Sequence, residues 1–209
     1  MTDWIRARTE QQKSERLQEI YDVARKLLSV QSFDSITLSS ISKELSFSRA
    51  NLYRYFQSKE DLYLSLMGNE VECFANELLH RFRDIENDSI SVFLAVWIPT
   101  FVEAKTLRVL LSMTGTILEQ NCSDVILIQA KKNMMKVLMN KTIPTMQRVL
   151  SSHSQQDCIE LHETLVLIGN GVVSFCGLSV HQQQVLQENG LEWFMTDFET
   201  DYRRILSRF

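Results

Sequence analysis

The residues best suited to chemistry lie between residues 37 and 59, where polar and cationic side chains recur at helical spacing. Successive residues of a helix lie 100° apart, so in a helix over residues 49–56 Leu52 and Phe56 share a buried side. The opposite side and its flanks carry Ala50, Asn51, Arg54, Tyr53 and Tyr55. This outward side has no acid, and its guanidinium, carboxamide and phenols could hydrogen-bond to base edges and phosphates in a DNA major groove.

A preceding helix should position this one. Thr37 is a suitable N-cap, and Leu38, Ile41 and Leu45 follow at i, i+3 and i+7, as on one buried face. Residues 46–48 then form a turn, with Ser48 as the cap of the second helix. Two helices joined in this way are also a compact packing unit that need not touch nucleic acid, so the pattern alone leaves both interpretations open.

The order of residues in this stretch resembles the tetracycline-repressor-like (TetR) family of bacterial transcription regulators. The matching positions are Thr37, Ile41, Ser42, Phe47, Ser48, Leu52, Tyr53, Tyr55, Phe56, Ser58, Lys59, Glu60 and Leu62. The chain departs from the family pattern at Ser46, where glycine is usual, at Phe47, where valine is common, and at Tyr55, where histidine is frequent. A left-handed backbone at Ser46 would cost about 1 to 2 kcal/mol.

The resemblance implies a helix-turn-helix that binds double-stranded DNA. The implied phosphate contacts are Thr37, Ser48, Tyr53, Tyr55 and Lys59. Arg49, Ala50, Asn51 and Arg54 would lie nearest the bases. Lys59 begins a helix, where a cation is unfavourable unless an anion such as a phosphate lies close by.

Composition predicts an all-α protein. Only two prolines and six glycines occur in 209 residues, and 44% of the residues are hydrophobic, enough for a packed core. No uninterrupted apolar run of membrane-spanning length and no secretion signal is evident, so we expect a cytoplasmic protein. The four cysteines, at positions 73, 122, 158 and 176, show no paired spacing and are expected to be buried thiols.

Charge is distributed unevenly along the chain. Residues 5–59 contain ten Lys or Arg and six Asp or Glu, a balance of +4, whereas the whole chain carries −4. A basic head on an acidic body can hold DNA at one end only. This charge distribution agrees with a DNA-binding domain over residues 1–58. The resemblance implies that residues 59–209 form a helical effector-binding and dimerisation domain.

Three further elements complete the head and its connection to the body. Residues 4–12 are expected to form a loose arm whose Arg6 and Arg8 could reach a phosphate, followed by a first helix ending near Ser29. Residues 58–61 resemble a capping box that opens a long helix over residues 59–82. That helix would bridge the two domains and transmit movement between them.

The middle of the chain is rich in aromatic residues and methionines. They are Phe93, Trp97, Phe101, Met113, Met134, Met135 and Met139. The resemblance implies that this region encloses a small-molecule effector, and such side chains make an adaptable apolar lining. Ordinary core packing is the alternative for each residue. Pro99 and Pro144 should bend helices over residues 90–105 and 124–150.

Two helices are predicted at the end of the chain, over about 157–180 and 185–209, with a turn possible near Asn189 and Gly190. By the resemblance they would pair with their copies in a homodimer as a four-helix bundle, and the alternative is that their apolar stripes are buried inside one subunit. Glycines at 169, 171 and 177 suggest that another helix presses close. A symmetric dimer would place two recognition helices about 34 Å apart on a palindromic operator.

Enzymatic motifs are missing from the sequence: there is no nucleophile elbow, phosphate-binding glycine loop or two-histidine metalloprotease motif. No catalytic residue, metal or cofactor is predicted. Cys158 and His162 are four residues apart, and with His153 or His181 they leave a metal-sensing or thiol-sensing regulator as an alternative. A helical partner-binding protein with a non-functional head is another. The main prediction is an effector-released homodimeric transcription regulator, most often a repressor in that family.

Overall fold

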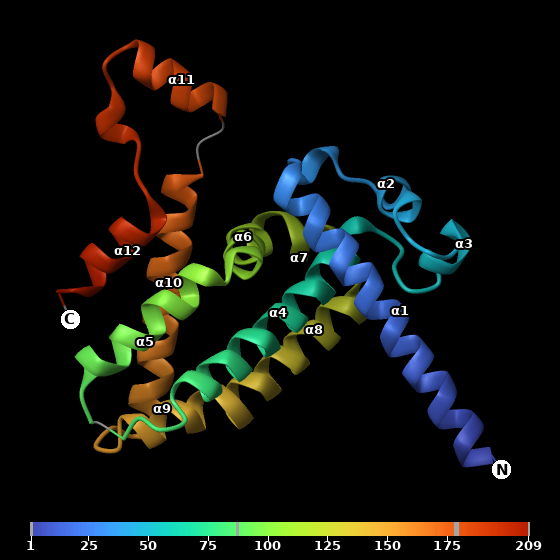
Figure 1. The fold of residues 1–209 in the computed structure, drawn as a ribbon, viewed down its shortest axis with the longest axis horizontal. Helices are drawn as coiled ribbons and strands as arrows, with labels where there is room; N and C mark the ends of the chain where they lie inside the picture. Colours follow the sequence, from blue (N-terminus) through green and yellow to red (C-terminus); the bar gives the residue numbers. More distant parts are fainter. Residues whose placement is uncertain (1, 87, 178–179, 209) are drawn as a thin grey trace.

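The structure is a computed structural model that describes residues 2–86, 88–177 and 180–208, and within these ranges it is helical and has no strand (Figure 1). The elements of the head and the bridging helix are α1 (Thr2–Val30), η1 (Phe33–Ser35), α2 (Leu38–Lys43), α3 (Arg49–Leu52) and α4 (Lys59–Arg81). The body contains α5 (Ile90–Glu103), α6 (Lys105–Met113), η2 (Thr114–Leu118), α7 (Glu119–Asn121), α8 (Asp124–Val137), η3 (Leu138–Thr142) and α9 (Ile143–Val149). The chain ends with α10 (Gln155–Cys176), α11 (Val180–Glu188), η4 (Glu192–Phe194) and α12 (Phe198–Leu206).

The helix-turn-helix forms as predicted at its start. Thr37 caps α2 in a reciprocal capping box, in which the Ser40 backbone N–H donates to Thr37 Oγ1 and the Thr37 N–H donates to Ser40 Oγ, both at 3.0 Å. Leu38 and Ile41 are buried, and Leu45 is partly buried against them. No described non-glycine residue has a positive φ, so Ser46 is not left-handed. Its N–H and hydroxyl donate instead to the Glu19 carboxylate of α1.

Two details of the second helix were predicted wrongly. The hydroxyl of Ser48 makes no capping hydrogen bond, and the α-helix ends at Leu52 rather than at Phe56. After Leu52 the chain continues as a tighter turn, because the N–H groups of Arg54 and Tyr55 donate to carbonyls three residues back. Leu52 and Phe56 are nevertheless buried on one side.

The predicted loose arm is also wrong, because α1 is helical from Thr2. The stretch contains no proline or glycine and is rich in Glu, Gln, Arg and Ala, so nothing interrupts the helix. The side chains of Arg6 and Arg8 lie outside the part of the chain whose side chains are described.

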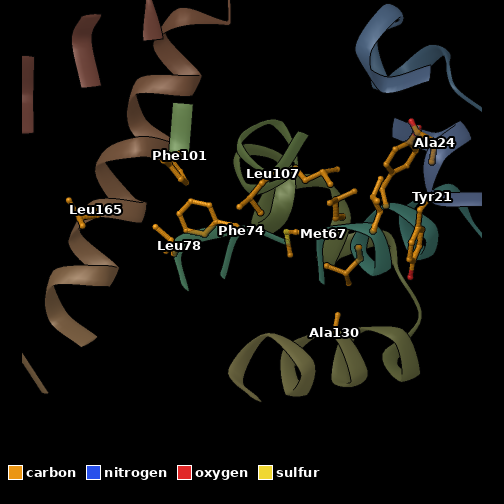
Figure 2. Close-up of a cluster of buried hydrophobic side chains, with 14 of the residues drawn as sticks. Tyr21, Ala24, Met67, Phe74, Leu78, Phe101, Leu107, Ala130 and Leu165 are labelled. Carbon is orange, nitrogen blue, oxygen red and sulfur yellow. The ribbon is translucent and has the colours of Figure 1, made fainter. Parts of the chain in front are cut away.

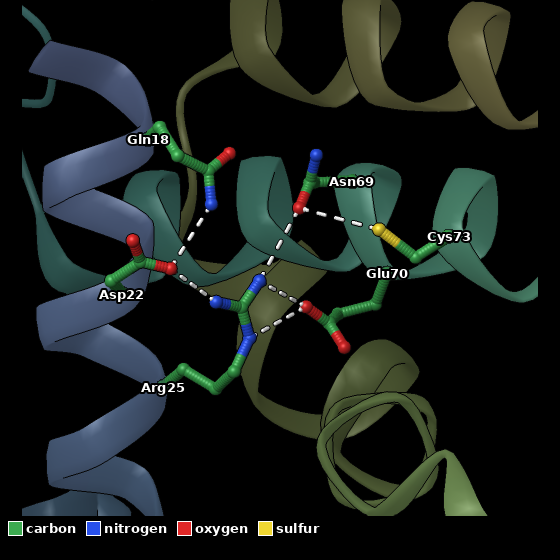
Figure 3. A network of polar contacts seen from close by, with 6 residues as sticks. All are labelled: Gln18, Asp22, Arg25, Asn69, Glu70 and Cys73. Atoms are coloured by element: carbon green, nitrogen blue, oxygen red, sulfur yellow. Dashed lines mark hydrogen bonds and ion pairs between the residues drawn. The ribbon is translucent and has the colours of Figure 1, made fainter. Parts of the chain in front are cut away.

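The bridging helix α4 is confirmed, one residue shorter than expected. Ser58 caps it, its hydroxyl accepting from the Asp61 N–H at 3.0 Å. The guanidinium of Arg25 on α1 donates to Glu70 on α4 at 2.7 Å and to Asp22 of its own helix at 2.6 Å, as Figure 3 shows. The first helix of the head is therefore attached directly to the bridge.

The two prolines affect the body differently. Pro144 follows the π-helical turn η3, whose wider winding accommodates the missing backbone donor and lets residues 124–149 continue without a helical break. The α5 helix runs through Pro99, and the chain instead turns by 79° after it, at Ala104. Asn87, between α4 and α5, lies outside the described residues.

The end of the chain differs most from the sequence prediction. Residues 185–209 are not one helix: α11 ends at Glu188, and α12 begins only at Phe198, capped by Asp197. The turn suggested near Asn189 and Gly190 is confirmed, since Gly190 turns the chain with a φ of 66°. Figure 1 shows α11 standing away from the body. Residues 178–179 and Phe209, at the ends of the predicted helices, lie outside the described residues.

Helix α12 packs inside its own subunit, which corrects the expectation that its apolar side faces a second copy. Phe198, Tyr202 and Leu206 are buried, and the Tyr202 hydroxyl donates to the Leu165 carbonyl and accepts from Trp97 Nε1, both at 3.0 Å. Burial raises the pKa of Tyr202, so the phenol stays neutral.

One core runs through the head, α4 and the body. Figure 2 shows its buried side chains converging on α4 from α1, α8 and α10. The glycine prediction is confirmed at Gly169, where a Cβ would collide with the ring of Phe101. A Cβ at Gly171 would meet no described atom within 4 Å, and one at Gly177 would lie 3.2 Å from the Val173 carbonyl oxygen of the preceding helix turn, so packing by another helix explains only Gly169.

Candidate nucleic-acid interface

The residues predicted nearest to DNA lie on one outer side of the head. We call Arg49, Ala50, Asn51, Tyr53 and Arg54 the reading surface. Arg49, Ala50 and Arg54 are exposed, Tyr53 is 41% exposed and Asn51 is half-buried. The buried neighbours Leu52 and Phe56 fix this side outward. Exposure meets the first requirement for contact with bases, and the contacts themselves stay a prediction.

Arg49 is held in place by its neighbours. Its guanidinium lies 5.2 Å from the centre of the Tyr53 ring, and Nη2 donates to the Tyr53 hydroxyl at 3.0 Å. Nη1 lies 3.5 Å from Ser39 Oγ, on the preceding helix. A stacked, planar guanidinium is pre-organised for bidentate recognition of a base or a phosphate.

Two cations that the sequence analysis did not assign complete the edge of the reading surface. Lys13 and Arg16 of α1 border a shallow depression together with Asn51, Arg54 and Tyr55. The guanidinium of Arg16 also lies 5.9 Å from the Phe47 ring. Because α1 is helical here, these two side chains lie beside α3 and the turn that follows it. The positive net charge of the head indicates a basic surface, but it does not show which cations lie there.

The predicted phosphate-contact residues are not alike. Thr37 and Ser48 are exposed, and Tyr55 is partly buried against the core. The ammonium of Lys59 donates to the Phe33 carbonyl at 2.8 Å and lies 4.3 Å from the Phe33 ring centre. Backbone carbonyls thus supply the negative partner that a cation at a helix N-terminus needs. Lys59 anchors η1 to α4, and a phosphate contact from it stays a prediction.

A buried carboxylate joins the head to the body. Asp61, 2% exposed, accepts from the Ser123 N–H at 2.7 Å and the Ser123 hydroxyl at 3.0 Å through Oδ1. Its Oδ2 accepts from the Gln57 N–H at 3.3 Å, next to the recognition segment. The sequence suggested Asp61 only as part of a cap. The loop before α8 is therefore tied to the residues that follow the reading surface.

The residues predicted to line an effector pocket divide into two groups. Phe93, Trp97 and Phe101 are buried on α5 in an aromatic cluster with Phe74 and Tyr202. The methionines, Met113, Met134, Met135 and Met139, are half-buried or, for Met135, exposed. Met113 lies on α6, which packs against α5, whereas Met134, Met135 and Met139 lie on α8 and η3, which pack against α4. Their joint role in a pocket stays a prediction.

Cys158 and His162 do not meet a third metal ligand in the described part of the chain, where no group of three or more His, Cys, Asp or Glu could hold a metal ion. Cys158 is buried, and desolvation raises the pKa of its thiol. His153 lies near Asp88, and His181 is exposed on α11. The side chain of His162 instead packs edge-on against Trp97, with ring centres 5.8 Å apart.

His162 should make folding pH-dependent. Its Nδ1 is buried without a hydrogen-bond partner in the described part of the chain, and desolvation lowers the pKa of His162 to about 4. In the unfolded chain the histidine has a pKa of about 6.5, so between pH 4 and pH 6.5 the unfolded state binds more protons than the folded state. The contribution of His162 to stability is therefore fully present above pH 6.5 and is lost as the pH falls toward 4.

We expect the free energy of unfolding to fall by about 3 kcal/mol over this range, as measured by urea unfolding. His162→Phe should flatten the profile and exposed His181→Gln should not; an unchanged slope in His162→Phe would contradict the assignment.

Comparison with known proteins adds to this geometry. Residues 20–66 match the family model described as bacterial regulatory proteins, tetR family, and residues 69–209 match the tetracyclin repressor-like C-terminal domain. An uncharacterized HTH-type transcriptional regulator of Mycobacterium tuberculosis is 33% identical over 84 residues, 40% of each chain. An HTH-type transcriptional regulator of Staphylococcus aureus is 30% identical over 74 residues, 35% of this chain and 38% of that one. The matched regions thus span about 40% of the curated relatives' length.

Proposed function

The chain belongs to the tetracycline-repressor-like (TetR) family of bacterial transcription regulators, and from this premise we propose that it is a repressor that binds a palindromic operator as a homodimer and is released by a small-molecule effector. Residues 1–58 would form the DNA-binding domain, and residues 59–209 the effector-binding and dimerisation domain. The protein would act in the cytoplasm. The family is a class of regulators and not of enzymes.

One observation supports the proposal above the others, namely the exposed, acid-free reading surface bordered by further cations. Arg49 and Arg54 face outward, and Lys13 and Arg16 of α1 lie along the same edge. Two nearby acids have other partners: Glu19 accepts from Ser46, and Glu44 pairs with Lys26 at 2.9 Å. A surface of this kind attracts the DNA backbone and offers donors to base edges.

Titration of the protein onto the promoter region of its own gene, at several salt concentrations, tests the proposal. Neutralised phosphates release counterions, so the logarithm of affinity should fall linearly with the logarithm of salt concentration, by about 0.9 per phosphate contacted. Nuclease footprinting should show two protected half-sites about one helical turn apart. Weak binding without a preferred sequence would reject the regulator and favour a partner-binding protein.

The dimer interface is proposed on α10 and on the segment from α11 to η4. Leu167 and Phe175 of α10 are 70% and 76% exposed, and Trp193 of η4 is 83% exposed. By length and composition α10 is apolar enough to cross a membrane, yet only 22% of its most apolar stretch is buried. A second copy of this surface would cover these side chains, as in the C-terminal bundle that the family resemblance implied.

A charge on this surface should separate the subunits. In Phe175→Glu, dimerisation would bury an unpaired carboxylate, at a cost of several kcal/mol, so we expect a shift from dimer to monomer in analytical ultracentrifugation. Binding to a palindromic operator should weaken at the same time. Val125→Glu, on α8, is the matched control, since Val125 is 72% exposed and belongs to another helix. A Phe175→Glu protein that remains a dimer would exclude this interface.

A further inference from the structure

A groove of about 510 Å³ lies where the head meets the body. Leu17 and Tyr55 border it from the head, Gly68 lies on α4, and Ala130 and Lys136 lie on α8. Figure 1 shows α1 crossing near the start of the α4–α8 pair, and Figure 3 shows Asn69 of α4 facing α1 at this junction. The volume falls within the range of small-molecule sites, about 300 to 1,000 Å³.

Gly68 keeps the α4 wall of the groove open. Glycine inside a helix costs about 1 kcal/mol relative to alanine, and at Gly169 the contact with Phe101 explains that cost. A Cβ at Gly68 would meet no atom within 4 Å. The space above Gly68 is therefore unused by the protein itself, and a larger side chain there would enter the groove.

The lining combines apolar and polar groups. Leu17, Ile126 and Ala130 supply apolar surface, while Gln129 and Asn133 supply carboxamides that make no side-chain hydrogen bond among the described residues. The groove has one unpaired positive charge among the described residues. Glu72 accepts from Lys141 at 2.7 Å, and the ammonium of Lys136 makes no ion pair in the described part of the chain.

We infer that this groove binds an amphiphilic organic anion, whose apolar body lies over Gly68 between Leu17 and Ala130 and whose acidic group lies at Lys136. A ligand there would contact Tyr55, directly after the reading surface, and α8 at the same time. The bound ligand would change how the head packs on the body, close to the hydrogen bonds between Asp61 and Ser123. The effect on DNA binding rests on the function proposed above, whereas the binding site does not.

Fluorescence titration of the full-length protein with anilinonaphthalene sulfonate tests the site, because this aromatic sulfonate brightens in apolar surroundings. We expect one saturable site per chain. Gly68→Phe should fill the groove and weaken binding about tenfold or more, whereas the matched variant Gly68→Ala should bind as the wild type does. Circular dichroism establishes that both variants are folded.

Lys136→Glu provides a second test that does not alter the buried part of the protein. It should weaken binding of the sulfonate about fivefold or more and leave binding of N-phenyl-naphthylamine, the uncharged analogue, unchanged. Trp193→Ser should leave the sulfonate site intact. Wild-type affinity in both Gly68→Phe and Lys136→Glu, or loss of binding in Trp193→Ser alone, would overturn the site, the latter by placing the dye on the exposed C-terminal surface.

The regulatory effect is measured separately, on DNA that the wild type protects in footprinting. Saturating sulfonate should lower DNA affinity for the wild type and Gly68→Ala but not for Gly68→Phe. If the dye occupies the groove and DNA affinity is unchanged, the proposed effect of the ligand on DNA binding is rejected. If no DNA site is found, the proposed function is rejected, and the dye titration still tests whether the groove binds an organic anion.

Discussion

Arg54→Ala should reduce affinity for the preferred operator about 5- to 150-fold for each half-site contacted, since a base-reading bidentate contact contributes about 1 to 3 kcal/mol. Arg54 is exposed beside Asn51 and makes no ion pair among the described residues, so its removal should leave the fold unchanged. Specificity should relax as well. Competition titrations with operator and random DNA measure both effects.

The control for Arg54→Ala must remove the same charge elsewhere. Arg83→Ala is suitable, because Arg83 is exposed and follows the opposite end of α4. Lys59→Ala is a poorer control, because it also removes the hydrogen bond from the Lys59 ammonium to the Phe33 carbonyl and could change the fold of the head. Equal operator affinities for Arg54→Ala and Arg83→Ala would remove Arg54 from the base contacts.

Asp61→Ala should lower the free energy of unfolding by about 3 kcal/mol, and the same variant should bind the operator more weakly. The carboxylate accepts from the Ser123 N–H and hydroxyl and from the Gln57 N–H, and a hydrogen bond to a charged group makes a net contribution of about 1.5 to 3 kcal/mol. Its removal leaves buried donors without an acceptor. Urea denaturation at neutral pH gives the change in unfolding free energy.

Asp61→Asn separates the two ends of this link. An asparagine can keep an oxygen toward Ser123 but then presents an N–H₂ group to the Gln57 donor, so we expect an intermediate loss of about 1 to 2 kcal/mol. Ser123→Ala removes only the hydroxyl contact and should cost less still. If Asp61→Ala unfolds at the wild-type urea concentration, the buried link has no energetic role.

Local pattern was sufficient for the helical class and for much of the head. The Thr37 and Ser58 caps, the buried positions of α2 and the length of α4 depend on interactions within about one turn of a helix, which spacing encodes directly. The family assignment followed from the order of residues in the same stretch. The same reasoning failed at the arm, where the absence of a breaker outweighed the expectation of a frayed terminus.

Tertiary packing decided which apolar faces are covered. The spacing of Phe198 and Tyr202 is equally compatible with packing against a partner subunit or against the core of the same subunit. Only the hydrogen bonds of Tyr202 with Trp97 and Leu165 show that the helix packs in its own subunit. Likewise Phe93, Trp97 and Phe101 read as a pocket lining or as core, and the fold stacks them against other rings. Burial depends on what lies opposite, which spacing along one helix does not contain.

The sequence by itself determined the helices, their caps and the acid-free side of the recognition segment, because these depend on neighbours three or four residues away. Only the tertiary structure placed Lys13 and Arg16 beside Arg54, bound Asp61 to Ser123 across 62 positions, and left an open groove above Gly68. Such contacts are set by how whole helices cross, and that depends on the packing of the entire chain.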